Sequence, residues 1–116
     1  MITVEQVRSH LGIAPDNTDD DEWLTMAVGA VNVEVAGYPL IADRDDPTAD
    51  WPANATTGAV MLAAHLYHSR NASQGRATFD ITQGFQSAYA DPEINRLLRI
   101  RRYGRPMMAG PTGATT

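Results

Sequence analysis

Residues 60–67, VMLAAHLY, decide the fold of this chain. They lie within a predicted helix over residues 53–70, and apolar side chains cover nearly every face of that helix. A helix without a polar face is usually the buried central one. Gly58, one turn earlier, allows a second helix to approach closely because it carries no Cβ. We therefore expect an all-α fold, a small bundle of about four helices packed around residues 53–70.

Two helices are predicted before the central one. A capping box at residues 3–6 opens the first helix, and Gly12 ends it. The second helix begins in the acidic run Asp19–Glu22, whose carboxylates are expected to cap free N–H groups, and it ends at Gly37. Its core-facing stripe consists of Leu24, Val28, Val31 and Val35. An acidic, turn-rich loop is expected over residues 38–52, with Trp51 anchoring it to the body.

Residues 71–90 leave two interpretations open. Apolar and polar residues alternate over residues 77–82, which indicates a strand, and Gln83-Gly84 could turn a short β-hairpin through residues 85–89. An isolated hairpin is only marginally stable, so a variable loop is the other interpretation.

Asp91-Pro92-Glu93 predicts the start of the last helix, with a capping Asp and Pro at the first helical position. Glu93 can pair with Arg96, three residues later. We expect the helix to end near Arg101 or Arg102 and the glycine- and proline-rich end to be a flexible tail. The predicted organisation is a helical domain over residues 1–101 and a flexible C-terminal arm over residues 102–116.

Composition limits the classes of protein. Hydrophobic residues make up 43% and charged residues 20% of the 116 residues, as in an ordinary soluble domain. No apolar run is long enough to span a bilayer, and the first residues do not resemble a signal peptide, so we expect no membrane partner. The chain contains no cysteine, which excludes disulfides and thiolate chemistry and fits synthesis in a reducing cytoplasm.

Charge is unevenly distributed along the chain. Residues 1–55 hold eleven acidic residues and two arginines, whereas residues 56–116 hold three acidic residues and seven arginines. The acidic part of one copy could pair with the basic part of another, which is a heterologous contact. The alternative is that both parts are solvated and the asymmetry is chance.

Few residues are candidates for a catalytic or metal-binding site. His65 and His68 could share a metal, but no third ligand is evident, and packing at an interface is the simpler interpretation. The acidic runs lack the spacing of a calcium loop. The adjacent Ser9 and His10 point in different directions on a helix. We therefore expect no active site, no cofactor and no enzyme activity.

The basic residues near the C-terminus form the one basic patch. It could dock to a protein, bind nucleic acid through phosphates, or be a solvated face. The patch consists of Arg96, Arg99, Arg101, Arg102 and Arg105.

The layout resembles the head-to-tail connector (adaptor) family of long-tailed bacteriophages. The resemblance runs from about residue 3 to residue 106. It rests on the short capped helix, on the acidic turn before Trp23-Leu24, on the apolar helix at residues 63–67, and above all on residues 94–106, INRLLRIRRYGRP, where an apolar and basic helix leads into a Tyr- and Arg-rich end.

The resemblance implies a structural virion protein at the head–tail junction. Family members assemble into a ring, dodecameric in the family, below the portal, and they extend the DNA channel without binding DNA specifically. The implied partners are the portal protein, further copies of the chain, and a tail-side connector or tail terminator protein. The alternative function is a small helical nucleic-acid-binding regulator that uses the C-terminal arginines.

The resemblance also implies candidate site residues. Those expected to dock to the portal or another partner are Arg99, Arg101, Arg102, Tyr103, Arg105 and Pro106. Those expected between subunits or facing the channel are Asp43, Asp45, Asp46, Phe79 and Phe85.

Overall fold

The computed structural model describes residues 1–46, 48–72 and 81–103, with backbone only at 71, 72 and 102. This part of the chain is helical and contains no strand. Its elements are α1 (Val4–Leu11), α2 (Asp21–Ala36), α3 (Pro39–Ala42), α4 (Ala53–Ala72), α5 (Ile81–Ala88), α6 (Pro92–Leu98) and the 3-10 helix η1 (Arg101–Tyr103). The expected all-α fold is confirmed.

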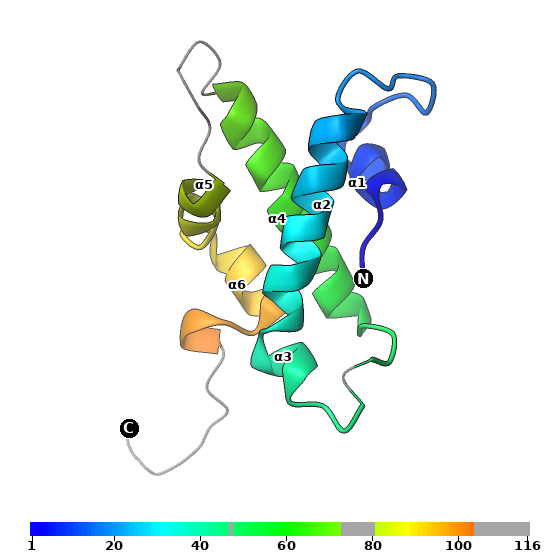
Figure 1. The fold of residues 1–116 in the computed structure, drawn as a ribbon. Helices are drawn as coiled ribbons and strands as arrows, with labels where there is room; N and C mark the ends of the chain where they lie inside the picture. Colours follow the sequence, from blue (N-terminus) through cyan, green and yellow to red (C-terminus); the bar gives the residue numbers. More distant parts are fainter. Residues whose placement is uncertain (47, 73–80, 104–116) are drawn as a thin grey trace.

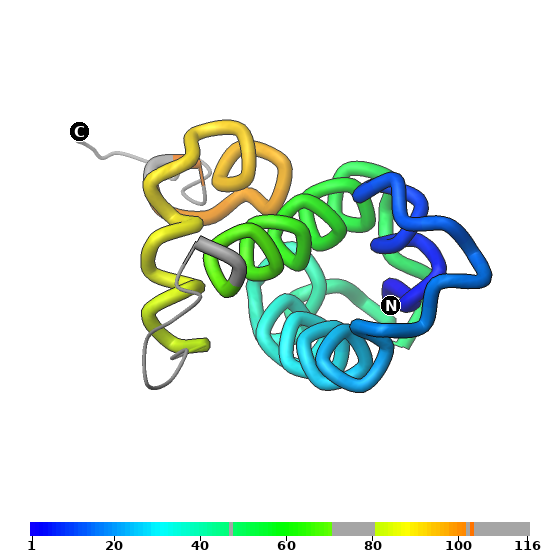
Figure 2. The backbone as a smooth tube through the Cα atoms, turned by 90° about the horizontal axis from the view of Figure 1, so that it is seen from above, coloured from blue at the N-terminus to red at the C-terminus, as the bar shows by residue number. Residues whose placement is uncertain are grey.

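Helix α4 is the centre of the bundle, as its apolar sequence predicts. It contacts α1, α2, α5 and α6. Figure 1 shows α2 crossing in front of α4, and Figure 2 shows α1 and the α5–α6 pair on opposite sides of α4. Leu62 and Leu66 on α4 are fully buried, as are Leu24 and Val31 of the α2 stripe. Burial of these side chains is the main source of stability.

The predicted glycine contact is present. A Cβ built on Gly58 would lie 2.8 Å from Cγ of Leu98 and 3.1 Å from Cβ of Leu97. Helix α6 therefore packs on α4 at a distance that only glycine allows at this position. Asn54, one turn earlier, donates a hydrogen bond from its side-chain amide to the carbonyl of Leu97 at 2.9 Å and fixes the same contact.

The capping residues at the starts of the helices are those predicted from the sequence, with one exception. The capping box is present at α1, where Thr3 and Gln6 bond each other's backbone N–H groups, and Asp91 caps α6 through the N–H of Glu93. The expectation that the acidic run caps α2 is wrong for Asp20, which occupies the N-cap position but makes no side-chain cap hydrogen bond. Its carboxylate accepts hydrogen bonds from Tyr67 and Arg70 on α4 instead.

The β-hairpin interpretation is wrong where the structure describes it, because residues 81–88 form α5. Phe85, expected on a strand, lies on a helix and is half-buried against the core. The alternating pattern was too short to exclude a helix, since Ile81, Gly84 and Ala88 also share one helical face, and that face packs on α4. The first part of the proposed strand, residues 77–80, lies outside the described residues.

The loop predicted over residues 38–52 contains the short helix α3, which begins at Pro39. Trp51 packs against the core, as expected. The last helix is shorter than predicted, because it ends at Leu98 and Arg99 adopts a left-handed conformation with φ of 55°. Among the helices described, none combines the length and apolar character needed to cross a membrane.

Candidate partner-docking surface

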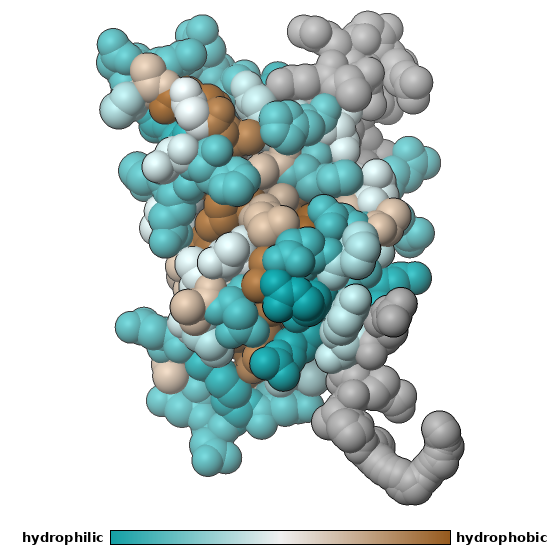
Figure 3. All heavy atoms as spheres, turned by 180° about the vertical axis from the view of Figure 1, so that it is seen from behind, coloured by the Kyte–Doolittle hydropathy of each residue, from teal (hydrophilic) through white to brown (hydrophobic). Residues whose placement is uncertain are grey.

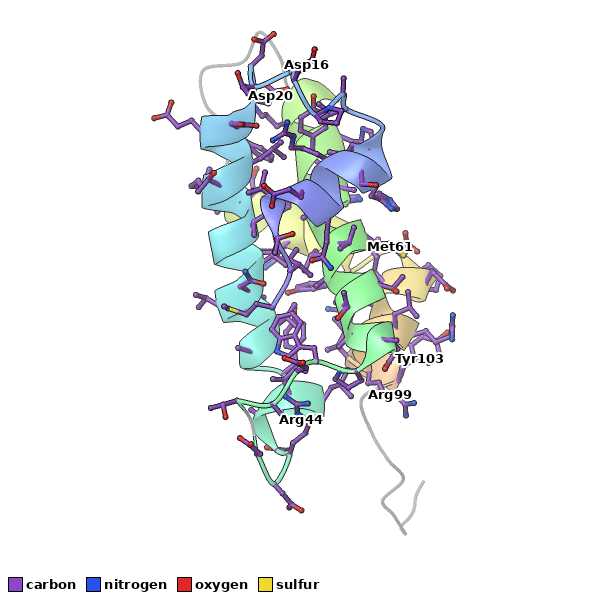
Figure 4. The ribbon with its side chains drawn as sticks, turned by 90° about the vertical axis from the view of Figure 1, so that its right-hand side faces the viewer. Asp16, Asp20, Arg44, Met61, Arg99 and Tyr103 are labelled. Atoms are coloured by element: carbon purple, nitrogen blue, oxygen red, sulfur yellow. The ribbon has the colours of Figure 1, made fainter. Side chains whose placement is uncertain are left out.

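The arginines predicted to dock to a partner lie beyond the end of α6, at one end of the bundle. Arg99 and Arg101 are exposed and Tyr103 is half-buried. The backbone of Arg102 belongs to η1, while Arg105 and Pro106 lie outside the described residues. Figure 4 shows Arg99 and Tyr103 near the lower end of α4, on the side away from α2.

The backbone that carries these arginines is fixed by a buried residue between them. Ile100 is 9% exposed, and its N–H donates to the carbonyl of Asn95 at 3.0 Å. Asn95 is buried in turn and donates from its side-chain amide to the carbonyl of Tyr89 at 2.7 Å. Arg99 and Arg101 have φ angles of 55° and 56°, a left-handed conformation uncommon in residues with a Cβ. Both side chains are therefore directed outward on either side of a buried anchor.

Arg101 also lies beside a cluster of three polar side chains, Glu34, Tyr38 and Tyr89, which we call the tyrosine cluster. The hydroxyl of Tyr89 donates to Oε2 of Glu34 at 2.6 Å, and that of Tyr38 lies 3.1 Å from the same oxygen. The guanidinium of Arg101 lies 5.9 Å from the centre of the Tyr89 ring, within cation–π distance. The cluster connects the end of α2 to the α5–α6 junction, close to the arginines.

Burial raises the pKa of both tyrosines. For Tyr38, the hydrogen bond with Tyr89 adds to the effect of burial. For Tyr89, burial and the hydrogen bond to Glu34 raise the pKa to about 12. Both hydroxyls are therefore protonated donors at neutral pH. No sequence pattern predicts this cluster, because its residues belong to three segments with no common spacing. The only signal is that both tyrosines stand at helix ends.

Arg96 is separated from the other arginines by its partner. Its guanidinium bonds both carboxylate oxygens of Glu93, at 2.5 Å and 3.2 Å, which confirms the predicted pair. The hydrogen bond from Arg96 lowers the pKa of Glu93, and the carboxylate raises the pKa of Arg96. Within the described part of the chain, the basic patch therefore consists mainly of Arg99 and Arg101.

The acidic loop after α3 presents Asp43, Asp45 and Asp46, all of them exposed. Arg44 points back into the loop and donates to the carbonyls of Ala49 at 2.8 Å and Asp50 at 2.9 Å. Hydrogen bonds from Thr48 lower the pKa of Asp46. Arg44 therefore holds the shape of the loop while the carboxylates face solvent. Phe79, grouped with these residues, lies outside the described part.

The two histidines of α4 contact different residues. His65 lies 3.1 Å, Nε2 to Oγ, from Ser87 on α5, and burial lowers its pKa. His68 is exposed and makes an edge contact with the Tyr67 ring, 5.9 Å between ring centres. Within the described residues, no three histidine or acidic side chains gather closely enough to hold a metal ion.

A second polar cluster lies at the opposite end of the bundle. Tyr67 donates to Asp20 at 2.7 Å, and Arg70 pairs with Asp20 at 3.3 Å while its guanidinium lies 5.2 Å from the Trp23 ring centre. The hydrogen bond from Tyr67 lowers the pKa of Asp20. These contacts join the first turn of α2 to the last turns of α4, so their role is structural.

Comparison with known proteins gives one match. A family model described as phage gp6-like head-tail connector protein matches residues 1–101. No curated protein and no solved structure matches the chain.

Proposed function

The chain belongs to the family of phage gp6-like head-tail connector proteins, and from this premise we propose that it forms a ring below the portal. It is a structural component of a phage virion. In the proposed role, the ring extends the DNA channel of the portal at the head–tail junction. The ring also offers a docking surface to a tail-side connector or tail terminator protein. In the proposed role, the chain is made in the host cytoplasm.

The observation that carries the proposal is the C-terminal end of the described chain. Arg99 and Arg101 are directed outward by a buried Ile100 and stand beside Tyr103. Arg and Tyr dominate the energetic centres of protein interfaces, because both bury area and donate hydrogen bonds. We assign Arg99 and Arg101, at the end of the helical domain of residues 1–101, to a portal-docking surface together with Tyr103, Arg102, Arg105 and Pro106 of the C-terminal arm that follows it.

The charge of the chain supports a channel that DNA passes through without being held. The net charge is −5, and the acidic loop at residues 43–46 is exposed. A dedicated DNA-binding domain is usually basic, because it must neutralise phosphates. The alternative function, a nucleic-acid-binding regulator, depends on Arg99, Arg101, Arg102 and Arg105 acting against this overall charge.

Truncation tests the proposed docking arm. Deletion of residues 102–116 is expected to leave the helical domain folded and to abolish docking to portal-containing heads. A milder deletion, of residues 104–116, keeps Tyr103 and its N–H bond to the carbonyl of Ile100. Circular dichroism checks folding, and co-sedimentation with heads measures docking. Unimpaired docking by both truncated chains, or unfolding of both, contradicts the proposal.

DNA binding separates the two functions. The connector is expected to bind duplex DNA weakly at physiological salt, whereas a regulator would bind tightly with a steep salt dependence. A DNA titration of the full chain at two salt concentrations decides between them. Tight, salt-sensitive binding that Arg99→Ala and Arg101→Ala abolish would favour the regulator.

A further inference from the structure

We propose that neighbouring copies of this chain pack the outer face of α2 against the outer face of α4, two uncharged surfaces on opposite sides of the domain. The inference rests on the proposed ring and names the surfaces through which the ring closes. No other occupant is required, because each copy supplies both faces.

The outer face of α2 is apolar although it is exposed. Val33 is 77% and Met26 50% exposed, and they are two of the three exposed large hydrophobic residues in the described part of the chain. Surface helices usually carry charge on the face turned to solvent, yet no charged residue occurs between Trp23 and Val33. Exposed apolar patches of this kind mark interaction surfaces. The exposed residues on this face are Thr25, Met26, Gly29, Val33 and Ala36.

The outer face of α4, on the other side of the molecule, is also uncharged, although it is less exposed than that of α2. Residues 53–69 contain no acidic residue and no arginine. Thr57 and His68 are exposed, and Met61, which shares their face at helical spacing, is half-buried. Figure 4 shows Met61 on the side of α4 away from α2. Figure 3 views this side and shows apolar residues along its middle, with hydrophilic residues flanking them.

Two different faces on opposite sides of one body favour a heterologous contact. When the α2 face of one copy meets the α4 face of the next, each copy still exposes one unused face. Such a contact repeats until a ring closes or a filament grows. An isologous dimer would instead use one face twice and leave the other exposed.

Charges beside the two faces support the same arrangement. The acidic loop with Asp43 and Asp45 lies below α2, where Figure 4 labels Arg44, while Arg99 lies below α4 on the opposite side. Packing α2 of one copy on α4 of the next, with the helical domains upright in both, brings the acidic loop towards Arg99 and Arg101 of its neighbour. Complementary charges at the rim orient such contacts.

Disulfide trapping tests the contact directly, because the natural chain has no cysteine. The variant Val33→Cys/Met61→Cys places one thiol on each face, and Met26→Cys/Thr57→Cys is a second pair that allows for a shift along the helices. The matched control, Ser9→Cys/Gln86→Cys, places two thiols at exposed positions of α1 and α5. Each variant is bound to portal-containing heads, treated with a mild oxidant and separated without reductant, and the amount that co-sediments with heads is measured in parallel.

A ladder of cross-linked chains is expected for at least one face pair, with at least about tenfold more cross-linked material than the control, because a disulfide forms only between nearby Cα atoms. Single variants of the same positions should give no ladder. Co-sedimentation without a ladder from either pair overturns this inference and leaves the proposed function intact. Dimers from Val33→Cys alone also overturn it, because they show an isologous α2 contact. Failure of the wild-type chain to co-sediment overturns the proposed function and this inference with it.

Discussion

The hydroxyl oxygens of Tyr38 and Tyr89 lie 2.5 Å apart, although 51 residues separate them in the sequence. Both also lie within hydrogen-bond distance of Oε2 of Glu34. Tyr38 precedes α3, and Tyr89 stands between α5 and α6, so this contact joins the two halves of the domain. It does so next to Arg101, where the proposed docking arm begins.

Alkaline pH is expected to weaken the domain through this cluster. The pKa of Tyr89 is raised to about 12 in the folded chain, whereas an unfolded tyrosine titrates near ~10. Stability is therefore unaffected below pH ~10 and falls as pH rises from ~10 towards ~12. The fall is on the order of 1 kcal/mol per pH unit, after allowance for solvent screening.

Urea unfolding at pH 8, 10 and 11 measures this effect. The variant Tyr89→Phe should lose part of the alkaline decline, while Tyr103→Phe, which alters a tyrosine outside the cluster, should behave as wild type. The same alkaline decline in wild type and Tyr89→Phe would contradict the assignment.

Gly58→Ala is expected to destabilise the domain by about 1–3 kcal/mol, because the added Cβ would collide with Leu98. Glycine to alanine in a helix is otherwise stabilising by roughly 0.5–1 kcal/mol. Gly29→Ala on α2 is the matched control, since nothing lies within 4 Å of its Cβ position. Thermal unfolding of the two variants should therefore shift in opposite directions. Equal shifts would contradict the close packing of α6 on α4.

Tyr67→Phe is expected to lower stability by about 1 kcal/mol at neutral pH, the net value of one hydrogen bond. The bond from Tyr67 lowers the pKa of Asp20 in the folded chain. Its contribution is therefore present above the unfolded pKa of ~4 and is lost as pH falls further. The difference in melting temperature between wild type and variant should be smaller at pH 3 than at pH 6. Asp19→Asn, a change to an exposed neighbour, is the control.

Charge reversal tests the rim of the proposed contact between copies. Arg99→Glu with Arg101→Glu should weaken assembly of the chain on portal-containing heads, because it places negative charge opposite the acidic loop. Adding Asp43→Arg and Asp45→Arg to the same chain restores opposite signs, so assembly should recover. Co-sedimentation at low and high salt measures both effects. Because Arg99 and Arg101 are also assigned to portal docking, the recovery tests the rim contact, and assembly that stays as weak in the fourfold variant as in the arginine variant would contradict it.

The sequence predicted most of the fold because local patterns agree with the packing. Residues 60–67 lack a polar face and form the centre of the bundle, and the caps at Thr3 and Asp91 lie where the sequence indicates. Residues 81–88 form a helix where the sequence left a hairpin or a loop open, because a short alternating run fits both strand and helix. Tertiary contacts decided between them: Gly84 and Ala88 are buried, and their helix packs on α4.

Less of the candidate docking surface could be predicted from the sequence. Arg99 and Arg101 are exposed because their backbones adopt left-handed conformations. An arginine at these positions does not predict such a conformation. Glu34, Tyr38 and Tyr89 meet only through the fold. Asp20 is a similar example. It is a typical N-cap residue type, but its carboxylate accepts hydrogen bonds from Tyr67 and Arg70, which only the fold brings close to it.

Cryo-electron microscopy of portal-containing heads incubated with the purified chain examines the connector role most directly. Heads that have bound the chain should show a closed ring of helical subunits below the portal, with the DNA channel continuing through its centre. Portals that remain bare at saturating concentrations of the chain, or a chain bound elsewhere on the head, would contradict that role.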